Sequence, residues 1–303
     1  HMILLQMWVL LSLIRVVESN CAAGYTGGWH GLASLISLID ARDAANVNIS
    51  PDGSVGIPDL SGTSGMTWTR SYGSTSFETV NDIPCWNLNA GTLVTSTRTT
   101  LGDRYTLFYY WKPRESDTAP SSWRALHRGY SGSTPTDYWV MVGQNNKNLG
   151  MYSSRNSGMR DSGYDITIEW QTLIVTGVAT STGSYSGTST FYVNGVQVGT
   201  ADRVGSGTQT YTIGYTTNNP PGYISVAGVL NQELTTAEIA ALHSTLVSGS
   251  SVSSCSACPA GKYSAAGIGQ VCGCAAGYTG GWNGLASLIS LIDARDAANE
   301  NIS

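Results

Sequence analysis

The acidic residues offer little for hydrolysis. Glu115 and Asp117 form the nearest pair of carboxyl groups that could act as acid and nucleophile, and they lie between Pro113 and Pro120. A retaining glycosidase needs two carboxyl groups held about 5 Å apart on a rigid element, whereas flanking prolines are typical of an exposed loop. We therefore predict that the protein is not an enzyme, with a glycoside hydrolase as the most distant alternative.

The histidines and the remaining acidic residues form no recognisable nucleophile or metal motif. His127 lies in a strand-like run and His243 in a helical one, and no Ser/His/Asp arrangement stands out. Asp161 and Asp165 could supply oxygen atoms to calcium, but the sequence around them lacks the ligand spacing of a calcium-binding loop. We predict neither a cofactor nor a bound metal ion.

Aromatic side chains next to amides indicate a different chemistry, the binding of carbohydrate. Such a surface needs an exposed ring for stacking and nearby polar groups for hydrogen bonds. Two stretches meet this description: Tyr138 and Trp139 with Gln144, Asn145 and Asn146, and Tyr215 and Tyr223 with Asn218 and Asn219. The alternative is that these rings belong to the core or to a half-buried sheet face.

The cysteines indicate a disulfide module. Six are present, and four of them follow one another in the order C-x2-C-x13-C-x-C, at Cys255, Cys258, Cys272 and Cys274. In a secreted chain this spacing is typical of a small disulfide framework. A zinc site is the weaker alternative, because the only histidine nearby in the sequence is His243.

The N-terminal segment predicts secretion. Residues 2–14 are almost all apolar and Ser19 provides a small residue at the expected cleavage point, so residues 1–19 resemble a signal peptide. A retained hydrophobic helix is the alternative, and Arg15 comes too early for a membrane span. The sequons at Asn48 and Asn301 agree with an extracellular glycoprotein.

Composition and charge exclude two classes of partner. Only 12% of residues are charged and the net charge is −5. A chain without a basic field has nothing to hold a phosphate backbone or an anionic lipid surface. We therefore expect no nucleic-acid partner and, once the signal is removed, no membrane.

The chain repeats its own opening. Residues 21–50 and residues 274–303 differ only at His30/Asn283 and Val47/Glu300. This identity indicates a tandem array of large units, of which the sequence covers one complete period and the start of the next.

Within the repeated block, apolar residues fall at helical spacing. Leu32, Leu35, Ile36 and Ile39 lie at i, i+3, i+4 and i+7, which predicts an amphipathic helix of about three turns. A helix this short must bury its apolar stripe against a partner. We expect that partner to be either the same chain or, as an assembly interface, another copy.

The middle of the chain predicts an antiparallel sandwich. From Met66 onward, short alternating runs are separated by turn residues, and Asn194-Gly195 is a strong hairpin signal. Thr235 and Glu238 have the spacing of a capping box, which predicts a closing helix that contains Ile239, Leu242 and Leu246.

Four motifs in this region carry a family resemblance. They are Trp170-Gln171-Thr172-Leu173-Ile174-Val175, Thr190-Phe191-Tyr192-Val193-Asn194-Gly195, Tyr211-Thr212-Ile213-Gly214, and Gly222-Tyr223-Ile224 continued by Leu230 to Ile239. In order and spacing they resemble the LamG-like jelly roll of the concanavalin A-like lectin and glucanase superfamily, with Ser225 where that family has aspartate. The resemblance implies a mainly β, two-sheet jelly roll that is used mostly for binding.

The cysteine-rich stretch carries a second resemblance. Cys255 to Ser264, with Cys272 to Gly280, is similar to the ephrin-receptor-like and EGF-like modules of extracellular proteins. The resemblance implies a rigid disulfide-stapled spacer with a Cys258–Cys272 bridge. One period, residues 21–273, holds an odd number of cysteines, so we further expect Cys255–Cys274 and Cys21–Cys85. The alternative for Cys85 is a free buried thiol.

These predictions combine into one domain plan and three ranked functions. The plan is a signal peptide or retained hydrophobic segment at 1–19, an EGF-like tail with its helix at 20–50, a linker at 51–65, a jelly roll at 66–247, a linker at 248–254, a cysteine-rich connector at 255–280 and a second copy of the helix at 281–303. We predict a structural subunit of an extracellular filament, flagellar hair or matrix fibre that binds copies of itself at the cell surface. A carbohydrate-binding adhesin that binds glycans is the alternative.

Overall fold

The computed structural model describes most of the central part of the chain and two short stretches on either side of it. The described residues are 20–21, 25–26, 34–43, 45–51, 56–61, 66–88, 91–113, 123–130, 138–143, 147–153, 158–181, 184–205, 207–214, 221–248, 256–257 and 267–268. They belong to two compact units, of which the larger is Ser34–Ser251 and the smaller joins His1–Ala33 to Val252–Ser303.

In the smaller unit, the chain ahead of the sandwich pairs with the cysteine-rich stretch that follows it. Strand β1 (Asn20–Cys21) is antiparallel to β21 (Gly267–Ile268), and β2 (Tyr25–Thr26) is antiparallel to β20 (Ser256–Ala257). The two cysteine-containing segments therefore form one unit by backbone pairing.

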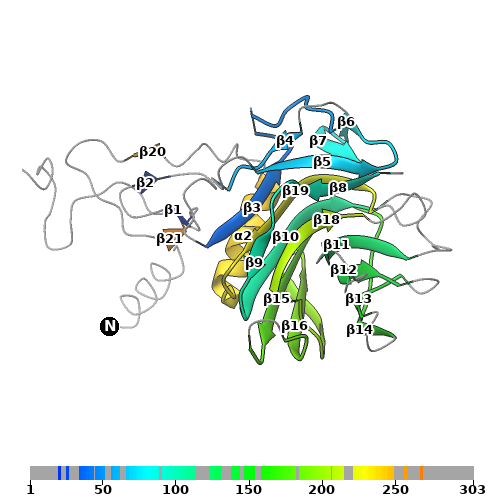
Figure 1. Ribbon diagram of the computed structural model, residues 1–303, viewed down its shortest axis with the longest axis vertical. Coiled ribbons are helices and arrows are strands. Elements are labelled where there is room, and N and C mark those ends of the chain that lie inside the picture. The colour runs from blue at the N-terminus through cyan, green and yellow to red at the C-terminus, as the bar shows by residue number, and fades with distance from the viewer. Residues whose placement is uncertain are drawn as a thin grey trace, which may run out of the picture. The chain divides into compact units, whose positions relative to one another are not determined.

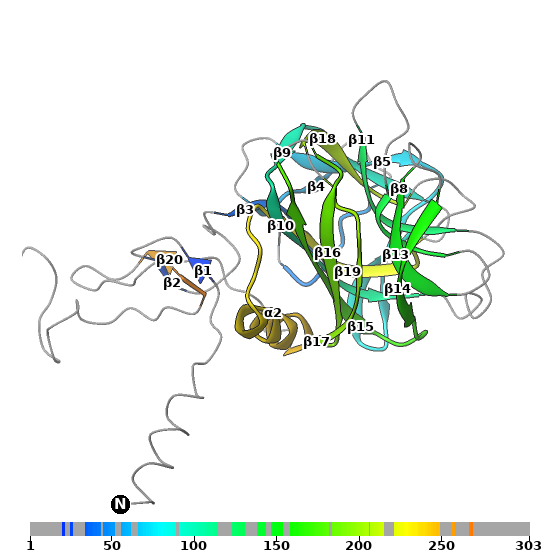
Figure 2. The same ribbon diagram turned by 90° about the horizontal axis from the view of Figure 1, so that it is seen from below.

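The larger unit is a sandwich of two antiparallel sheets (Figures 1 and 2). The eight-stranded sheet has the order β17 (Val196–Ala201), β16 (Gly187–Val193), β15 (Gln171–Ala179), β10 (Arg104–Lys112), β19 (Tyr223–Leu230), β7 (Ile83–Asn87) and β6 (Ser76–Val80), and β3 (Leu35–Asp40) also pairs with β19. The nine-stranded sheet has the order β14 (Gly158–Asp165), β13 (Asn148–Ser153), β12 (Tyr138–Val142), β11 (Arg124–Tyr130), β18 (Gly207–Ile213), β8 (Thr92–Thr95), β5 (Thr67–Tyr72) and β4 (Ile57–Pro58), and β9 (Thr99–Leu101) also pairs with β18. The predicted mainly β jelly-roll sandwich is confirmed.

The central strands of the eight-stranded sheet are buried on both faces. One row across it, on the side of the second sheet, consists of Ile39, Ala227, Tyr109, Leu173 and Val193. The adjacent row consists of Leu38, Gly228, Phe108, Ile174 and Tyr192 and faces the other way. Helix α2 (Thr236–Ser248) lies against this outer face, where it contacts β10 and β15 (Figure 2).

The helix predicted around Leu35, Ile36 and Ile39 is wrong. Leu35–Asp40 is strand β3, and it pairs with β19 from Val226 to Leu230. A strand buried on both faces is a continuous apolar run, and a run of this kind also satisfies the spacing of an amphipathic helix. Leu35 and Ile39 are 5% and 0% exposed, so in this structure their side chains are buried inside their own chain. Leu32 lies outside the described residues.

The hairpin and the closing helix form as predicted. Asn194 and Gly195 have φ of 50° and 78° and connect β16 directly to β17, because only residues that tolerate positive φ can make this tight turn. At the start of α2, the Glu238 carboxylate accepts from the Thr235 backbone N–H at 2.8 Å, and the Thr235 hydroxyl accepts from the Glu238 N–H at 3.3 Å. Both the turn and the capping box were readable from local sequence.

Candidate functional site

The most strongly perturbed titratable groups lie between the two sheets. His127 on β11 is joined to Tyr109 on β10 by a hydrogen bond of 2.5 Å between Nδ1 and Oη. Its ring is stacked on Trp139 of β12 with centroids 5.4 Å apart, and Tyr211 of β18 packs beside it at 5.3 Å. We call these four side chains the inner aromatic cluster.

Burial is the largest cause of the pKa shifts in the inner aromatic cluster. It lowers the pKa of His127 to about 3, because an imidazolium removed from water loses its hydration. It also raises the pKa of Tyr109 well above its usual value. Both groups are therefore neutral at physiological pH. All four members are no more than 1% exposed, so the cluster is part of the core and no substrate reaches it.

The structure corrects one predicted sugar platform. Trp139 is fully buried in the inner aromatic cluster and cannot stack on a ligand, because its neighbours on both sides are core side chains. Tyr223 is half-buried at the start of β19. Gln144, Asn145, Asn146, Tyr215, Asn218 and Asn219 lie outside the described residues, as does the Glu115/Asp117 pair.

The structure also corrects the pairing predicted for Cys85. This cysteine has a free thiol and is buried on β7, where it lies opposite Glu78 of β6. Burial and the Glu78 charge raise the pKa of the thiol to about 12, which leaves it protonated and unreactive. The alternative of a free buried thiol therefore describes Cys85, which forms no disulfide in the structure. Cys255, Cys258, Cys272 and Cys274 lie outside the described residues, and only the backbone of Cys21 is described.

A second candidate site lies on the opposite, outward face of the nine-stranded sheet. Along β13, Leu149 and Met151 point into the core, so Gly150 and Tyr152 between and beyond them face outward. Tyr152 is half-buried, and its ring contacts the half-buried Trp123, with centroids 5.7 Å apart and planes at 51°. Tyr138 holds the register position opposite Tyr152 on β12.

Polar groups lie farther along the same face. The Asn148 amide donates to the Asp161 carboxylate on β14, and the other carboxylate oxygen accepts from the Gly163 backbone N–H at 2.7 Å. Asp161 is exposed and Asn148 half-buried. Asn148 and Tyr152 are four positions apart along the strand, which corresponds to about 13 Å. We call Trp123, Tyr152, Asn148 and Asp161 the outer platform.

Gly150 separates the two ends of the outer platform. A β-carbon here would lie 2.3 Å from the Arg160 carbonyl oxygen and 2.9 Å from the Met159 methyl. A larger residue would therefore push β14 away from β13. The floor of the platform is consequently backbone and the flexible Met159 side chain.

Sequence reasoning missed the outer platform because its aromatic members stand far apart in the chain. Neither Trp123 nor Tyr152 belongs to a motif that the sequence displays. The signal available for Tyr152 is the period-two alternation of Leu149, Met151 and the residues between them. Nothing in the sequence pairs Trp123 with Tyr152, because two strand connections lie between them.

The described residues carry no local signature of a metal site or of a membrane-spanning helix. Within the described part of the chain, no group of three His, Cys, Asp or Glu side chains is placed to hold a metal ion. No helix among the described residues is long and apolar enough to cross a membrane. Asn48, one predicted glycosylation site, is exposed with φ of 61°, whereas Asn301 lies outside the described residues.

Comparison with known proteins finds similarity in structure alone. No family model matches the chain, and no curated protein matches it in sequence. Among solved structures, domain 4 of AbnA, a GH43 extracellular arabinanase from Geobacillus stearothermophilus in complex with arabinotriose, is 15% identical with a TM-score of 0.47, covering 69% of this chain and 98% of that one. The botulinum neurotoxin serotype D binding domain is 12% identical with a TM-score of 0.48, covering 70% of this chain and 51% of that one. Trypanosoma rangeli sialidase in complex with sialic acid is 14% identical with a TM-score of 0.45, covering 70% and 33%.

Proposed function

We propose that the protein is a carbohydrate-binding module and that the outer platform is its binding surface. The observation that carries the proposal is the half-buried Trp123–Tyr152 pair, which shares one sheet face with a hydrogen-bonded carboxylate and amide. A sugar ring has an apolar face of C–H groups and a rim of hydroxyls, so it needs both kinds of contact at once. The outer platform offers a ring contact at Trp123 and Tyr152 and a polar contact at Asn148 and Asp161.

The geometry favours an oligosaccharide over a single sugar. The two ends of the platform are about 13 Å apart along β13, which is longer than one sugar ring. Asp161 is already oriented by the Asn148 amide and the Gly163 N–H, so little ordering is needed when a hydroxyl donates to it. We therefore expect neutral, hydroxyl-rich glycans to bind without hydrolysis.

An array of immobilised oligosaccharides tests the proposal with the labelled full chain. We expect a restricted set of glycans to be bound, and Trp123→Ala to abolish the signal on that set. Tyr72→Ala is the matched control, because Tyr72 is a 51% exposed aromatic side chain at the end of β5, across the same sheet. Binding that survives Trp123→Ala, or an array with no bound glycan, would contradict the proposal.

The repeated block favours a second candidate, a structural subunit of an extracellular filament, flagellar hair or matrix fibre. Residues 21–50 and 274–303 are almost identical, as expected for tandem repeats that build a fibre. This role also fits the proposed secretion signal and the proposed disulfide spacer. Negative-stain microscopy of native material tests it: fibres with a regular repeat support the role, and single dispersed particles contradict it.

A further inference from the structure

Strand β3 lies at an edge of the eight-stranded sheet and is held by contacts along both of its own edges. Its backbone pairs with β19 from Val226 to Leu230, and on its free edge the Leu38 carbonyl accepts from the Leu60 N–H at 2.8 Å. The Leu38 N–H donates to the Asp59 carboxylate at 3.0 Å, and the Ser37 hydroxyl donates to the same carboxylate at 2.7 Å. Without β3, the sheet would expose the edge of β19 and the apolar side chains that β3 covers.

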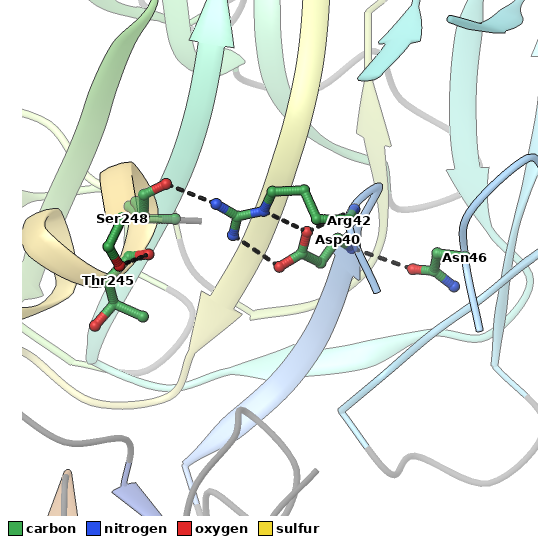
Figure 3. A network of polar contacts seen from close by, with 6 residues as sticks. Asp40, Arg42, Asn46, Thr245 and Ser248 are labelled. Carbon is green, nitrogen blue, oxygen red and sulfur yellow. Dashed lines mark hydrogen bonds and ion pairs between the residues drawn. The ribbon is translucent and has the colours of Figure 1, made fainter. Parts of the chain in front are cut away.

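A polar anchor fixes the end of β3 (Figure 3). Arg42 binds both carboxylate oxygens of Asp40 at 2.8 Å and donates to the Leu246 carbonyl oxygen at 2.7 Å, near the C-terminal end of α2. The Asp40 N–H donates to the Asn46 side-chain oxygen at 3.1 Å. The sandwich therefore recognises this segment by side chains as well as by its backbone.

The chain carries a second copy of every residue that makes these contacts. From Ser34 to Ser50 the second block, residues 287–303, differs only at Val47, where it has Glu300. Val47 is 39% exposed, so the one change falls on a side chain that faces water. The second-block equivalents of Leu38, Asp40, Arg42 and Asn46 are Leu291, Asp293, Arg295 and Asn299, respectively. The second block thus matches the β3 site as well as β3 does.

We infer that the second block is a donor strand, which takes the place of β3 beside β19 in a second copy of this chain. One β19 edge admits one such strand, so the two blocks compete for it. The exchange preserves the contacts of the β3 site and adds no new ones. The equilibrium between the unexchanged and the exchanged form is therefore set by the protein concentration and by the chain segments that connect each block to the sandwich. The match between the second block and the β3 segment identifies the partner as another copy of this chain. The exchange does not depend on glycan binding.

Cross-links report where the second block lies. Val229 is the register partner of Ser37, and Ser290 is the second-block equivalent of Ser37. In Val229→Cys with Ser290→Cys, oxidation after refolding at high concentration is expected to give disulfide-linked multimers. Val229→Cys with Ser37→Cys is the control and is expected to give a bond within one chain. A Val229–Ser290 pair that yields no bond, or only an intrachain bond, would overturn the inference.

A matched set of variants separates exchange from loss of folding. Leu38→Asp places a charge at a buried position of the first block, and Leu291→Asp makes the same change in the second. We expect Leu291→Asp to be a folded monomer, Leu38→Asp to fold into dimers or larger species as concentration rises, and the double variant to have no cooperative unfolding transition. A Leu38→Asp chain that behaves like the double variant at every concentration, or that folds as a monomer throughout, would overturn the inference.

Discussion

The two faces of the nine-stranded sheet carry similar residue types in opposite environments. On the inner face, His127, Trp139 and Tyr211 are completely or almost completely buried against Tyr109 of the eight-stranded sheet. On the outer face, Trp123 and Tyr152 are half-buried beside a carboxylate and an amide. The largest pKa shift of a histidine lies on the inner face, where no ligand arrives. A perturbed pKa caused by burial alone therefore marks a core position here, and the partly exposed rings mark the candidate binding surface.

The largest expected effect separates the two tryptophans. Trp139→Ala removes a fully buried ring from the core and should lower the free energy of unfolding by about 3–5 kcal/mol. Trp123→Ala removes a half-buried ring and should cost about 1 kcal/mol. Denaturant unfolding of both variants measures the difference. Equal costs would mean that the two faces are not distinct in their contribution to folding.

Acid should destabilise the inner face. The pKa of His127 is about 3 in the folded protein and near 6.5 in the unfolded chain, so the unfolded state binds the extra proton. Its contribution to stability is complete above pH 6.5 and declines as the pH falls toward 3, by about 1.4 kcal/mol per pH unit. Unfolding curves measured across this window should show the loss. His127→Phe combined with Tyr109→Phe should flatten the curve, because the histidine that binds the proton is then absent. The change at Tyr109 is included so that no buried hydroxyl is left without its hydrogen-bond partner.

A second histidine provides the control for the pH experiment. Burial also lowers the pKa of His243, which shares a hydrogen bond of 2.8 Å with the Thr172 hydroxyl. His243→Gln should remove only the smaller part of the acid sensitivity. If His243→Gln flattens the curve as much as the double change at His127 and Tyr109, the inner aromatic cluster is not the source of the pH dependence.

The smallest expected effect tests the floor of the outer platform. Gly150→Ala should displace β14, because the new methyl lies within 2.3 Å of the Arg160 carbonyl oxygen. We expect a loss of about 1–2 kcal/mol of stability and weaker glycan binding. Asn148→Ala should leave stability within about 1 kcal/mol while still weakening binding, since it removes only the amide that orients Asp161. Retained binding in both variants would remove the polar end from the proposed site.

Local signals predicted the parts of the fold that local chemistry determines. The Asn194-Gly195 turn and the Thr235/Glu238 cap are specified by backbone conformation and by residues three apart, and both are present. The β3 segment was assigned to a helix because burial on both faces removes the alternation that identifies a strand. Its partner β19 lies almost 190 residues away, at Val226–Leu230 opposite Leu35–Asp40, and no local pattern indicates that pairing.

The site was harder to predict than the fold. Trp139 could be assigned either to a sugar platform or to the core, because aromatic residues alternate with polar ones in core strands and in binding surfaces alike. Whether a ring faces inward depends on strand register, and β11 and β12 contain register shifts between Ala125 and Arg128 that a sequence does not display. Trp123 and Tyr152 come together only after β11, β12 and β13 have paired in this register.

Calorimetric titration of a glycan selected on the array shows whether the outer platform binds carbohydrate. The wild-type chain should bind it with a measurable heat, Trp123→Ala should weaken the affinity at least tenfold, and Tyr72→Ala should bind like the wild type. The same three proteins should give matching unfolding transitions to within about 1 kcal/mol. If Trp123→Ala binds with wild-type affinity, whatever the affinity of Tyr72→Ala, the outer platform is not the binding surface.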